Sequence, residues 1–294
     1  MIPLVVDLSI VIPAFNEAEA IGPFVDDLVG CLASSKIAHE IILVNDGSTD
    51  GTGETIHDLA ERHDTVRALS HGTNRGYGAS LKSGIKEAGA EIIAITDADG
   101  TYPADRVAGL YQNLQDGKFD MVVGARTGDE VHIPLIRRPA KALIGCLANY
   151  VSGTKIPDLN SGLRVFHRDA AIECFHLISD GFSFTTTITL SFIARHRSVE
   201  YIPVDYGHRT GRSKIHPIRD TLNFFVLIVR TAVFFQPLKI FAPTSLLLTA
   251  GGIAWGVVQI QRDGGIGDAP VLLLVSALQV FLVGLIADMI SRRG

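Results

Sequence analysis

Residues 91–100 read EIIAITDADG, an apolar run that ends in two aspartates, Asp97 and Asp99. The same arrangement of an apolar run and a polar loop occurs at 9–17 (SIVIPAFNE), 40–51 (EIILVNDGSTDG) and 120–126 (DMVVGAR). Segments with the apolar spacing of helices, such as 17–33 and 77–89, lie between these runs. The alternation predicts βαβ units and a buried parallel sheet, and therefore an α/β fold.

The two aspartates follow a predicted strand, and ligands of such sheets bind where strands end. Residues two apart in an extended segment point the same way, so Asp97 and Asp99 can approach one cation together. Carboxylate oxygens suit Mg²⁺ or Mn²⁺ that carries substrate phosphates. The alternative is an ordinary Asp-Gly turn without a metal. This stretch alone leaves both interpretations open.

Two further loops carry groups that suit a nucleotide. Asn45 and Asp46 end the second apolar run, where their acceptors could bind the imide N–H of uracil or guanine. The first run ends in Pro13, Phe15 and Glu17, which offer a ring to pack near a base and a carboxylate for ribose hydroxyls. Each loop is a weak signal on its own.

The C-terminal part is apolar enough for a membrane. Residues 238–260 and 269–290 each approach the roughly 20 residues that span a bilayer, and the short polar turn between them predicts a helical hairpin. Lys239 before the first span and Arg292 and Arg293 after the second favour the cytosolic side for both ends.

Residues 218–236 precede the hairpin and are apolar except for a stripe that contains Arg219, Asn223 and Arg230. This pattern favours a helix in the membrane interface, with a buried helix as the alternative.

The composition and the absence of certain motifs argue against several classes of function. With 26 basic and 31 acidic side chains the net charge is −5, which does not favour a nucleic-acid partner. The sequence has no GxGxxG, GK[ST], HExxH or GxSxG motif and no CxxC spacing. We expect its three cysteines to be buried free thiols in a reducing compartment.

Six motifs, taken in order, resemble the family 2 inverting glycosyltransferases of GT-A fold: IPAFNEAEAI, VNDGSTDGT, NRGYGASLKSGI, TDADGTYP, GAR and LNSGLRVF. Together with the hairpin they resemble the polyprenyl-phosphate glycosyltransferases, a group that includes dolichyl-phosphate mannose synthases and bacterial undecaprenyl-phosphate glucosyltransferases. The resemblance implies a Rossmann-like, nucleotide-sugar-binding GT-A domain over 1–217. An interfacial amphipathic helix over 218–238 and two transmembrane helices over 239–294 would follow.

The resemblance also implies roles for individual residues. Asp97 and Asp99 would hold Mg²⁺ or Mn²⁺ on the donor diphosphate, and these two residues with Arg126 would be catalytic. The donor nucleotide would be bound by Pro13, Phe15, Glu17, Asn45, Asp46 and Asp97. The acceptor phosphate would be bound by Arg126, Arg137 and Lys141. The donor diphosphate would be bound by Arg209, Arg212 and Lys214. The chain departs from mannose synthases, which commonly have tyrosine at Phe15 and glutamine at Thr101, and Lys141 stands where a serine can occur.

The implied reaction is inverting transfer of a hexose-type sugar from GDP-mannose or a UDP-sugar to dolichyl or undecaprenyl phosphate. The enzyme would be an integral membrane protein of the cell membrane or the ER membrane, with a cytosolic catalytic domain and possible homo-oligomers. A phosphate monoester is largely anionic at pH 7, because its second pKa is roughly 6, so the acceptor would need no general base.

Three alternatives stay open. Another lipid acceptor, such as an alcohol, would need a base, for which Asp158 or Asp129 are candidates. Processive polysaccharide synthases usually carry QxxRW and more spans, whereas the one tryptophan here, Trp255, lies inside the first span. A nucleotide-sugar-binding membrane scaffold without turnover could dispense with the metal, which the intact Asp97 and Asp99 argue against.

Overall fold

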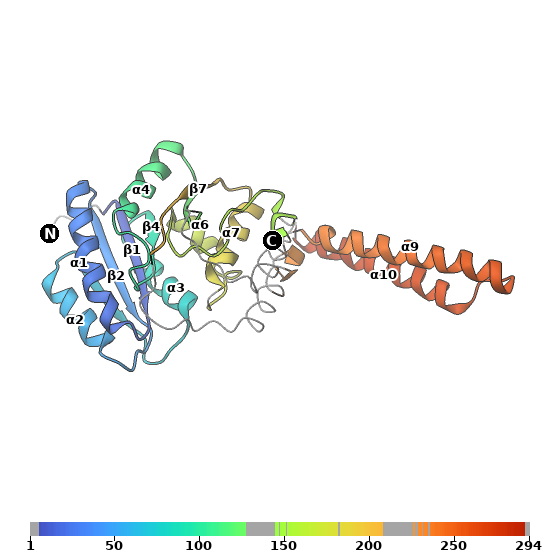
Figure 1. The fold of residues 1–294 in the computed structure, drawn as a ribbon, viewed down its shortest axis with the longest axis horizontal. Helices are drawn as coiled ribbons and strands as arrows, with labels where there is room; N and C mark the ends of the chain where they lie inside the picture. Colours follow the sequence, from blue (N-terminus) through green and yellow to red (C-terminus); the bar gives the residue numbers. More distant parts are fainter. Residues whose placement is uncertain are drawn as a thin grey trace.

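The computed structural model describes residues 6–127, 145–146, 148–150, 152–181, 183–207, 226, 229–230, 232–234 and 236–291. Within them, seven strands form one sheet in the order β3-β2-β1-β4-β6-β5-β7 (Figure 1). The strands are β1 (Leu8–Ala14), β2 (His39–Asn45), β3 (Val66–Ser70), β4 (Ile92–Ile95), β5 (Met121–Ala125), β6 (Arg164–His167) and β7 (Val199–Pro203). The helices are α1 (Ala18–Ser35), α2 (Thr52–Arg62), α3 (Tyr77–Glu87), α4 (Arg106–Gly117), α6 (Arg168–Glu173), α7 (Phe184–Ala194), α9 (Leu238–Asp263) and α10 (Asp268–Ser291).

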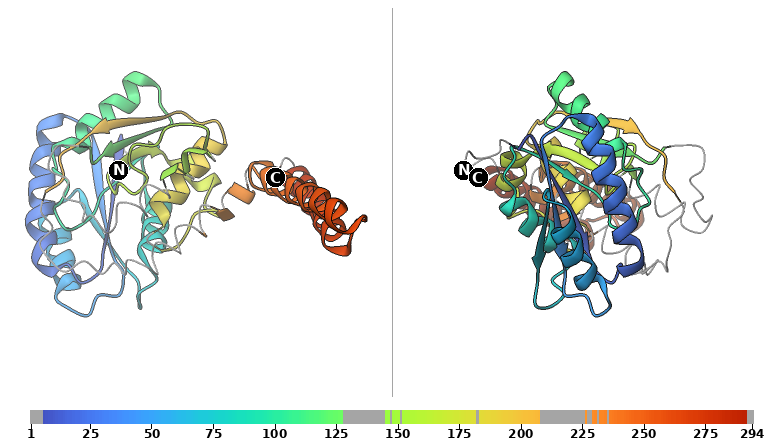
Figure 2. Two further views of the ribbon diagram at one scale, coloured as in Figure 1. Left: turned by 45° about the vertical axis from the view of Figure 1, so that its right-hand side comes forward. Right: turned by 90° about the vertical axis from the view of Figure 1, so that its left-hand side faces the viewer.

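Helices cover both faces of the sheet, as Figure 2 shows from two sides. Side chains alternate between the faces of a strand, so Ile10 and Ile12 pack with α1, α2 and α4, whereas Val11 packs with α3, α6 and α7. The four predicted apolar runs form β1, β2, β4 and β5 and are almost completely buried. The predicted α/β architecture is therefore confirmed.

The strands predicted between residues 8 and 125 run parallel to one another, as expected, and the sheet becomes mixed only through β6, which lies beyond them. Strands β1 to β4 are parallel, but β6 is antiparallel to both β4 and β5. Gly124 N, in β5, donates to Leu163 O just before β6, at 3.0 Å. The chain therefore re-enters the sheet at the level of the carboxyl end of β5, and β6 runs in the opposite direction to β4 and β5. Consequently, the start of β6 lies beside the carboxyl ends of β4 and β5.

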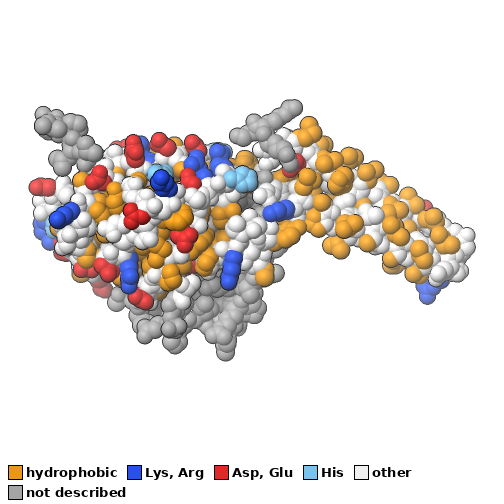
Figure 3. Space-filling view, turned by 90° about the horizontal axis from the view of Figure 1, so that it is seen from above, with side chains coloured by type: hydrophobic (Ala, Val, Ile, Leu, Met, Phe, Trp, Pro, Cys, Tyr) orange, Lys and Arg blue, Asp and Glu red, His pale blue; other side chains and the backbone are white. Residues whose placement is uncertain are grey.

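Helices α9 and α10 form the predicted hairpin, which projects from the α/β domain (Figure 1). Both are long and apolar enough to cross a membrane, by length and composition. Small and polar groups join them: Ser245 Oγ donates to Ala277 O at 2.8 Å, and Gly284 faces Phe241. Large apolar side chains cover the outside of the hairpin, while charged side chains gather on the domain (Figure 3).

Two sequence predictions concern the amphipathic helix before the hairpin and the burial of the cysteines. Most of the predicted amphipathic helix over 218–238 lies outside the described residues. The three cysteines are free thiols, but burial was predicted wrongly for two of them: Cys174 is buried, Cys31 is half-buried and Cys146 is exposed.

Candidate active site

The loops after β1 and β2 are joined by hydrogen bonds between neighbouring strand ends. Asn16 has a left-handed backbone, with φ of 54°, and its side-chain oxygen accepts from Thr49 N at 2.8 Å. Asn16 N donates to Ser48 Oγ at 3.1 Å, and Glu17 N donates to Thr52 Oγ1 at 2.9 Å. The predicted nucleotide residues on β1 and its loop therefore lie beside those on β2.

Asp46 is buried, and its carboxylate holds the segment that precedes α3. Its Oδ1 bonds His71 Nδ1 at 2.7 Å and accepts from Arg75 N at 2.9 Å, while Oδ2 accepts from Gly76 N at 2.8 Å. Burial raises the pKa of Asp46, but these hydrogen bonds outweigh burial and the pKa is lowered overall. The carboxylate oxygens of Asp46 are thus engaged by the segment between β3 and α3.

Asn45 is likewise engaged within its loop. Its side-chain oxygen accepts from Ser48 N at 3.0 Å, and its amide nitrogen would lie 2.9 Å from a Cβ added at Gly53. Base recognition by Asn45 and Asp46 stays a prediction, while the contacts show a role in shaping the loop.

Asp97 and Asp99 lie just beyond the end of β4, as predicted, but the segment is not extended. Ala98 and Asp99 form a turn, and Gly100 has a left-handed backbone with φ of 68°. Asp99 is 8% exposed, and its Oδ1 accepts from Thr101 Oγ1 at 2.6 Å and from Thr101 N at 3.1 Å. The argument from alternating side chains was therefore wrong, because this stretch is a turn whether or not it holds a cation.

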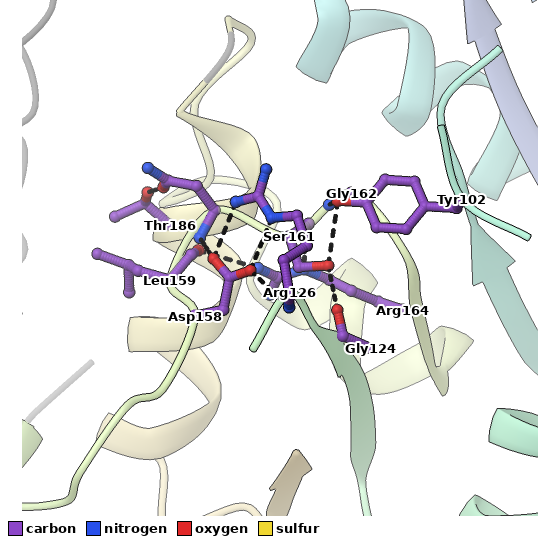
Figure 4. Close-up of polar contacts among 10 residues, drawn as sticks. Tyr102, Gly124, Arg126, Asp158, Leu159, Ser161, Gly162, Arg164 and Thr186 are labelled. Carbon is purple, nitrogen blue, oxygen red and sulfur yellow. Dashed lines mark hydrogen bonds and ion pairs between the residues drawn. The ribbon is translucent and has the colours of Figure 1, made fainter. Parts of the chain in front are cut away.

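Two groups that the sequence did not single out touch Asp97. Tyr77, the first residue of α3, donates its phenol to Asp97 Oδ1 at 3.0 Å. A Cβ added to Gly162 would lie 2.5 Å from Asp97 Oδ2, so this close approach requires glycine. Gly162 N in turn donates to the Tyr102 hydroxyl at 2.8 Å (Figure 4).

Arg126 follows β5 and forms a two-pronged ion pair with Asp158 (Figure 4). Arg126 Nε donates to Asp158 Oδ2 at 2.7 Å, Nη2 donates to Oδ1 at 2.9 Å, and Arg126 N donates to Oδ2 at 3.0 Å. The guanidinium also stacks over Tyr206, 5.2 Å from the ring centroid. Arg126 is therefore rigidly oriented at the end of β5.

Asp158, a candidate base for an alcohol acceptor, is engaged in the ion pair with Arg126 and suits that role poorly. Burial raises its pKa, but the hydrogen bonds and charge of Arg126 outweigh burial and lower the pKa overall. A carboxylate that is held ionised by an arginine has little tendency to take up a proton near neutral pH.

Arg164, at the start of β6, has a completely buried side chain. Its Nε donates to Ser161 O at 2.8 Å, Nη2 donates to Leu159 O at 2.9 Å, and Nη1 donates to Thr189 Oγ1 on α7. Arg164 thereby ties the loop over 158–162 to the domain core (Figure 4). This loop carries Asp158, which pairs with Arg126, and Gly162, which lies against Asp97.

A divalent cation fits the chemistry of Asp97 and Asp99, which offer hard oxygen ligands. Among the described residues no three His, Cys, Asp or Glu side chains are grouped to hold a metal. Magnesium is commonly held by one or two carboxylates together with substrate phosphates and water, so two aspartates suffice for a donor-bound ion. Thr101, which stands where mannose synthases commonly have glutamine, is 1% exposed and directs its hydroxyl to Asp99.

Five of the predicted phosphate-binding residues lie outside the described part of the chain. They are Arg137, Lys141, Arg209, Arg212 and Lys214, and Asp129 lies outside it as well. Of the described candidates, Pro13 is buried, and Phe15 and Glu17 are half-buried near the β2 loop.

Comparison with known proteins agrees with this geometry. The sequence profile described as glycosyl transferase family 2 matches residues 9–175, more than half of the chain. The chain belongs to glycosyl transferase family 2. A second profile, the GtrB C-terminal hairpin, matches residues 236–292 and covers α9 and α10.

Curated members of this family are similar over most of their length. A dolichyl-phosphate beta-glucosyltransferase of Trichomonas vaginalis is 28% identical over 80% of this chain and 73% of its own. A dodecaprenyl-phosphate galacturonate synthase of Rhizobium johnstonii is 27% identical over 97% of this chain and 88% of its own.

Among solved structures, glucosyl-3-phosphoglycerate synthase from Mycobacterium tuberculosis, in complex with Mn²⁺, uridine diphosphate and glucosyl-3-phosphoglycerate, aligns with a TM-score of 0.59. It shares 17% identity over 77% of this chain and 80% of its own. This likeness confirms the predicted GT-A fold.

Proposed function

We propose that this family 2 glycosyltransferase transfers a sugar from a nucleotide-diphosphate sugar to a polyprenyl phosphate. One observation carries the proposal: Asp97 and Arg126 follow the carboxyl ends of β4 and β5, the two strands that flank β6, in a domain attached to a hairpin of two apolar helices. The relatives named for dolichyl and dodecaprenyl phosphates support this class of acceptor.

In the proposed reaction the donor nucleotide lies along the loops after β1 and β2, and the diphosphate lies against Asp97 and Asp99. A Mg²⁺ or Mn²⁺ ion held by these carboxylates would neutralise charge on the departing nucleoside diphosphate. The solved relative, which was crystallised with Mn²⁺ and uridine diphosphate, supports such a donor and ion.

The acceptor phosphate would lie on the other side of the anomeric carbon and attack it in line, with inversion. Arg126 is proposed to orient this phosphate, and Nη1 is the guanidinium nitrogen outside the pair with Asp158. Arg137 and Lys141 are proposed to add charge to the same phosphate, and Arg209, Arg212 and Lys214 to the donor diphosphate. Because a monoester phosphate is already anionic near pH 7, the main tasks are positioning and charge neutralisation.

The hairpin would keep the domain at the headgroup plane, where a water-soluble donor can meet a lipid phosphate. We infer that this plane is the cytosolic face, because Lys239 lies at the start of the first span and Arg292 and Arg293 follow the second span in the sequence. A reporter fused within the turn at 264–267 should be found on the opposite side of the membrane.

Transfer to a lipid alcohol has less support, because the paired Asp158 is unsuited to act as a base.

The test is to incubate the purified full chain with Mn²⁺, a short polyprenyl phosphate and a panel of UDP- and GDP-sugars, and to identify the lipid product by mass. A polyprenyl-phosphate sugar should form, and Asp99→Asn should abolish it without changing membrane insertion. A product on polyprenol or diacylglycerol, or undiminished turnover by Asp99→Asn, would contradict the proposal.

A further inference from the structure

We propose that Tyr77 is a positioning residue that orients the Asp97 carboxylate for cation binding, and that Asp46 holds Tyr77 in place. The inference rests on the proposed function, because it takes Asp97 as a ligand of the donor-bound ion. It connects two loops, at the ends of β2 and β4, that are separate in sequence.

The contact between Tyr77 and Asp97 is direct. The phenol at the beginning of α3 donates to Asp97 Oδ1 at 3.0 Å, across 20 residues of sequence. A carboxylate at the end of a strand can rotate about its last side-chain bond, and a fixed hydrogen bond to one oxygen restricts that rotation. A donor on Oδ1 therefore favours one orientation of the carboxylate, and in the proposal this is the orientation that binds the ion.

Gly162 restricts Asp97 from a second direction. A Cβ at Gly162 would lie 2.5 Å from Asp97 Oδ2 and 2.8 Å from Asp97 Cγ, so the carboxylate rests against bare backbone. Tyr102 fixes this backbone by accepting from Gly162 N at 2.8 Å. The Asp97 carboxylate thus lies between a hydrogen-bond donor on α3 and the chain that enters β6.

The backbone around Tyr77 is itself held on both sides. Asp46 accepts from Arg75 N at 2.9 Å and from Gly76 N at 2.8 Å, and Gly76 adopts φ of 101°, which favours glycine. On the other side, Ala79 N donates to Asp180 O at 2.9 Å. These contacts fix the first turn of α3, so the position of the phenol is determined by the loop that Asp46 organises.

A deletion of the phenol hydroxyl isolates this role. Tyr77→Phe keeps the ring and its packing but removes the donor to Asp97. Tyr111→Phe is the matched control, because the Tyr111 hydroxyl on α4 bonds only to Gln115 Nε2 among the contacts described, at 3.3 Å, in an exposed position. Both variants should keep the thermal unfolding midpoint of the unaltered protein within a few degrees.

The experiment measures Mn²⁺ binding to the full chain in detergent, once in the presence of UDP and once in the presence of GDP. Binding is detected as the loss of the electron paramagnetic resonance signal of free Mn²⁺. We expect Tyr77→Phe to weaken nucleotide-dependent Mn²⁺ binding about tenfold, which equals about 1.4 kcal/mol. The affinity of Tyr77→Phe for the nucleotide without metal, measured by calorimetry, should differ from that of the unaltered protein by less than about twofold. Tyr111→Phe should behave as the unaltered protein.

The outcomes separate the two proposals. If the unaltered protein binds no Mn²⁺ with either nucleotide, the assignment of Asp97 to a donor-bound ion fails and the role of Tyr77 fails with it. If the unaltered protein binds Mn²⁺ and Tyr77→Phe binds it equally well, only the positioning role is overturned. Equal losses of metal-free nucleotide binding and of Mn²⁺ binding would also overturn it, because they would show a general structural role.

Discussion

Replacing Asp158 by asparagine tests how strongly the site depends on a buried ion pair. The side chain of Asp158 is 6% exposed and that of Arg126 is 24% exposed, so solvent screens this pair weakly. Asparagine keeps one acceptor oxygen but turns an amide NH₂ toward a guanidinium, which also only donates. Arg126 would then be a largely buried cation without its counter-charge.

Removal of one partner of a buried pair costs about 3–5 kcal/mol, and the partial exposure of Arg126 favours the lower end, about 3 kcal/mol. For a domain of this size each kcal/mol lowers the unfolding midpoint by roughly 2–4 °C, so Asp158→Asn should lower it by about 6–12 °C. Near-ultraviolet circular dichroism of the domain tyrosines is the suitable signal, because the single tryptophan, Trp255, belongs to α9.

A double-mutant cycle isolates the pair. Arg126→Met added to Asp158→Asn removes the stranded cation and should restore about 2 kcal/mol or more. The control is Asp205→Asn at the exposed pair with Arg106, where the side chain of Asp205 is 80% exposed and that of Arg106 is 46% exposed. There the midpoint should shift by less than about 2 °C. A coupling energy below about 0.5 kcal/mol between Arg126 and Asp158 would refute the reasoning.

Two further predictions concern a glycine and a buried glutamate. Gly162→Ala places a methyl group 2.5 Å from Asp97 Oδ2, so Mn²⁺-dependent transfer should fall about tenfold or more, as measured by a Mn²⁺ titration of activity; unchanged metal dependence would contradict this. Burial raises the pKa of Glu40, but hydrogen bonds from Ser9 Oγ, Gly89 N and Arg67 lower it overall. Its stabilising contribution is therefore present above about pH 4.3 and is lost as pH falls through its lower folded pKa. Unfolding midpoints of the unaltered protein and Glu40→Gln should differ at pH 7 and converge as pH falls through the lowered folded pKa of Glu40, and a difference independent of pH would show that the charge of Glu40 does not matter.

Local patterns account for the parts of the fold that the sequence predicted correctly. β1, β2, β4 and β5 are buried on both faces, so their residues form continuous apolar runs that are visible without a structure. β3 and β7 were missed because they are the edge strands, where exposed and half-buried positions interrupt the run. β6 reads RVFH, so only two apolar residues lie between Arg164 and His167 and no continuous apolar run marks the strand.

The sequence by itself determined the α/β alternation, the motifs at the strand ends and the two apolar helices, because each depends on residues close together in the chain. Only the tertiary structure decided which groups meet there. Tyr77 bonds Asp97 across 20 residues, Gly76 N bonds Asp46 across 30 and Arg126 bonds Asp158 across 32. No local pattern encodes these pairs, because the reversed direction of β6 and the packing of α3 on the sheet bring them together.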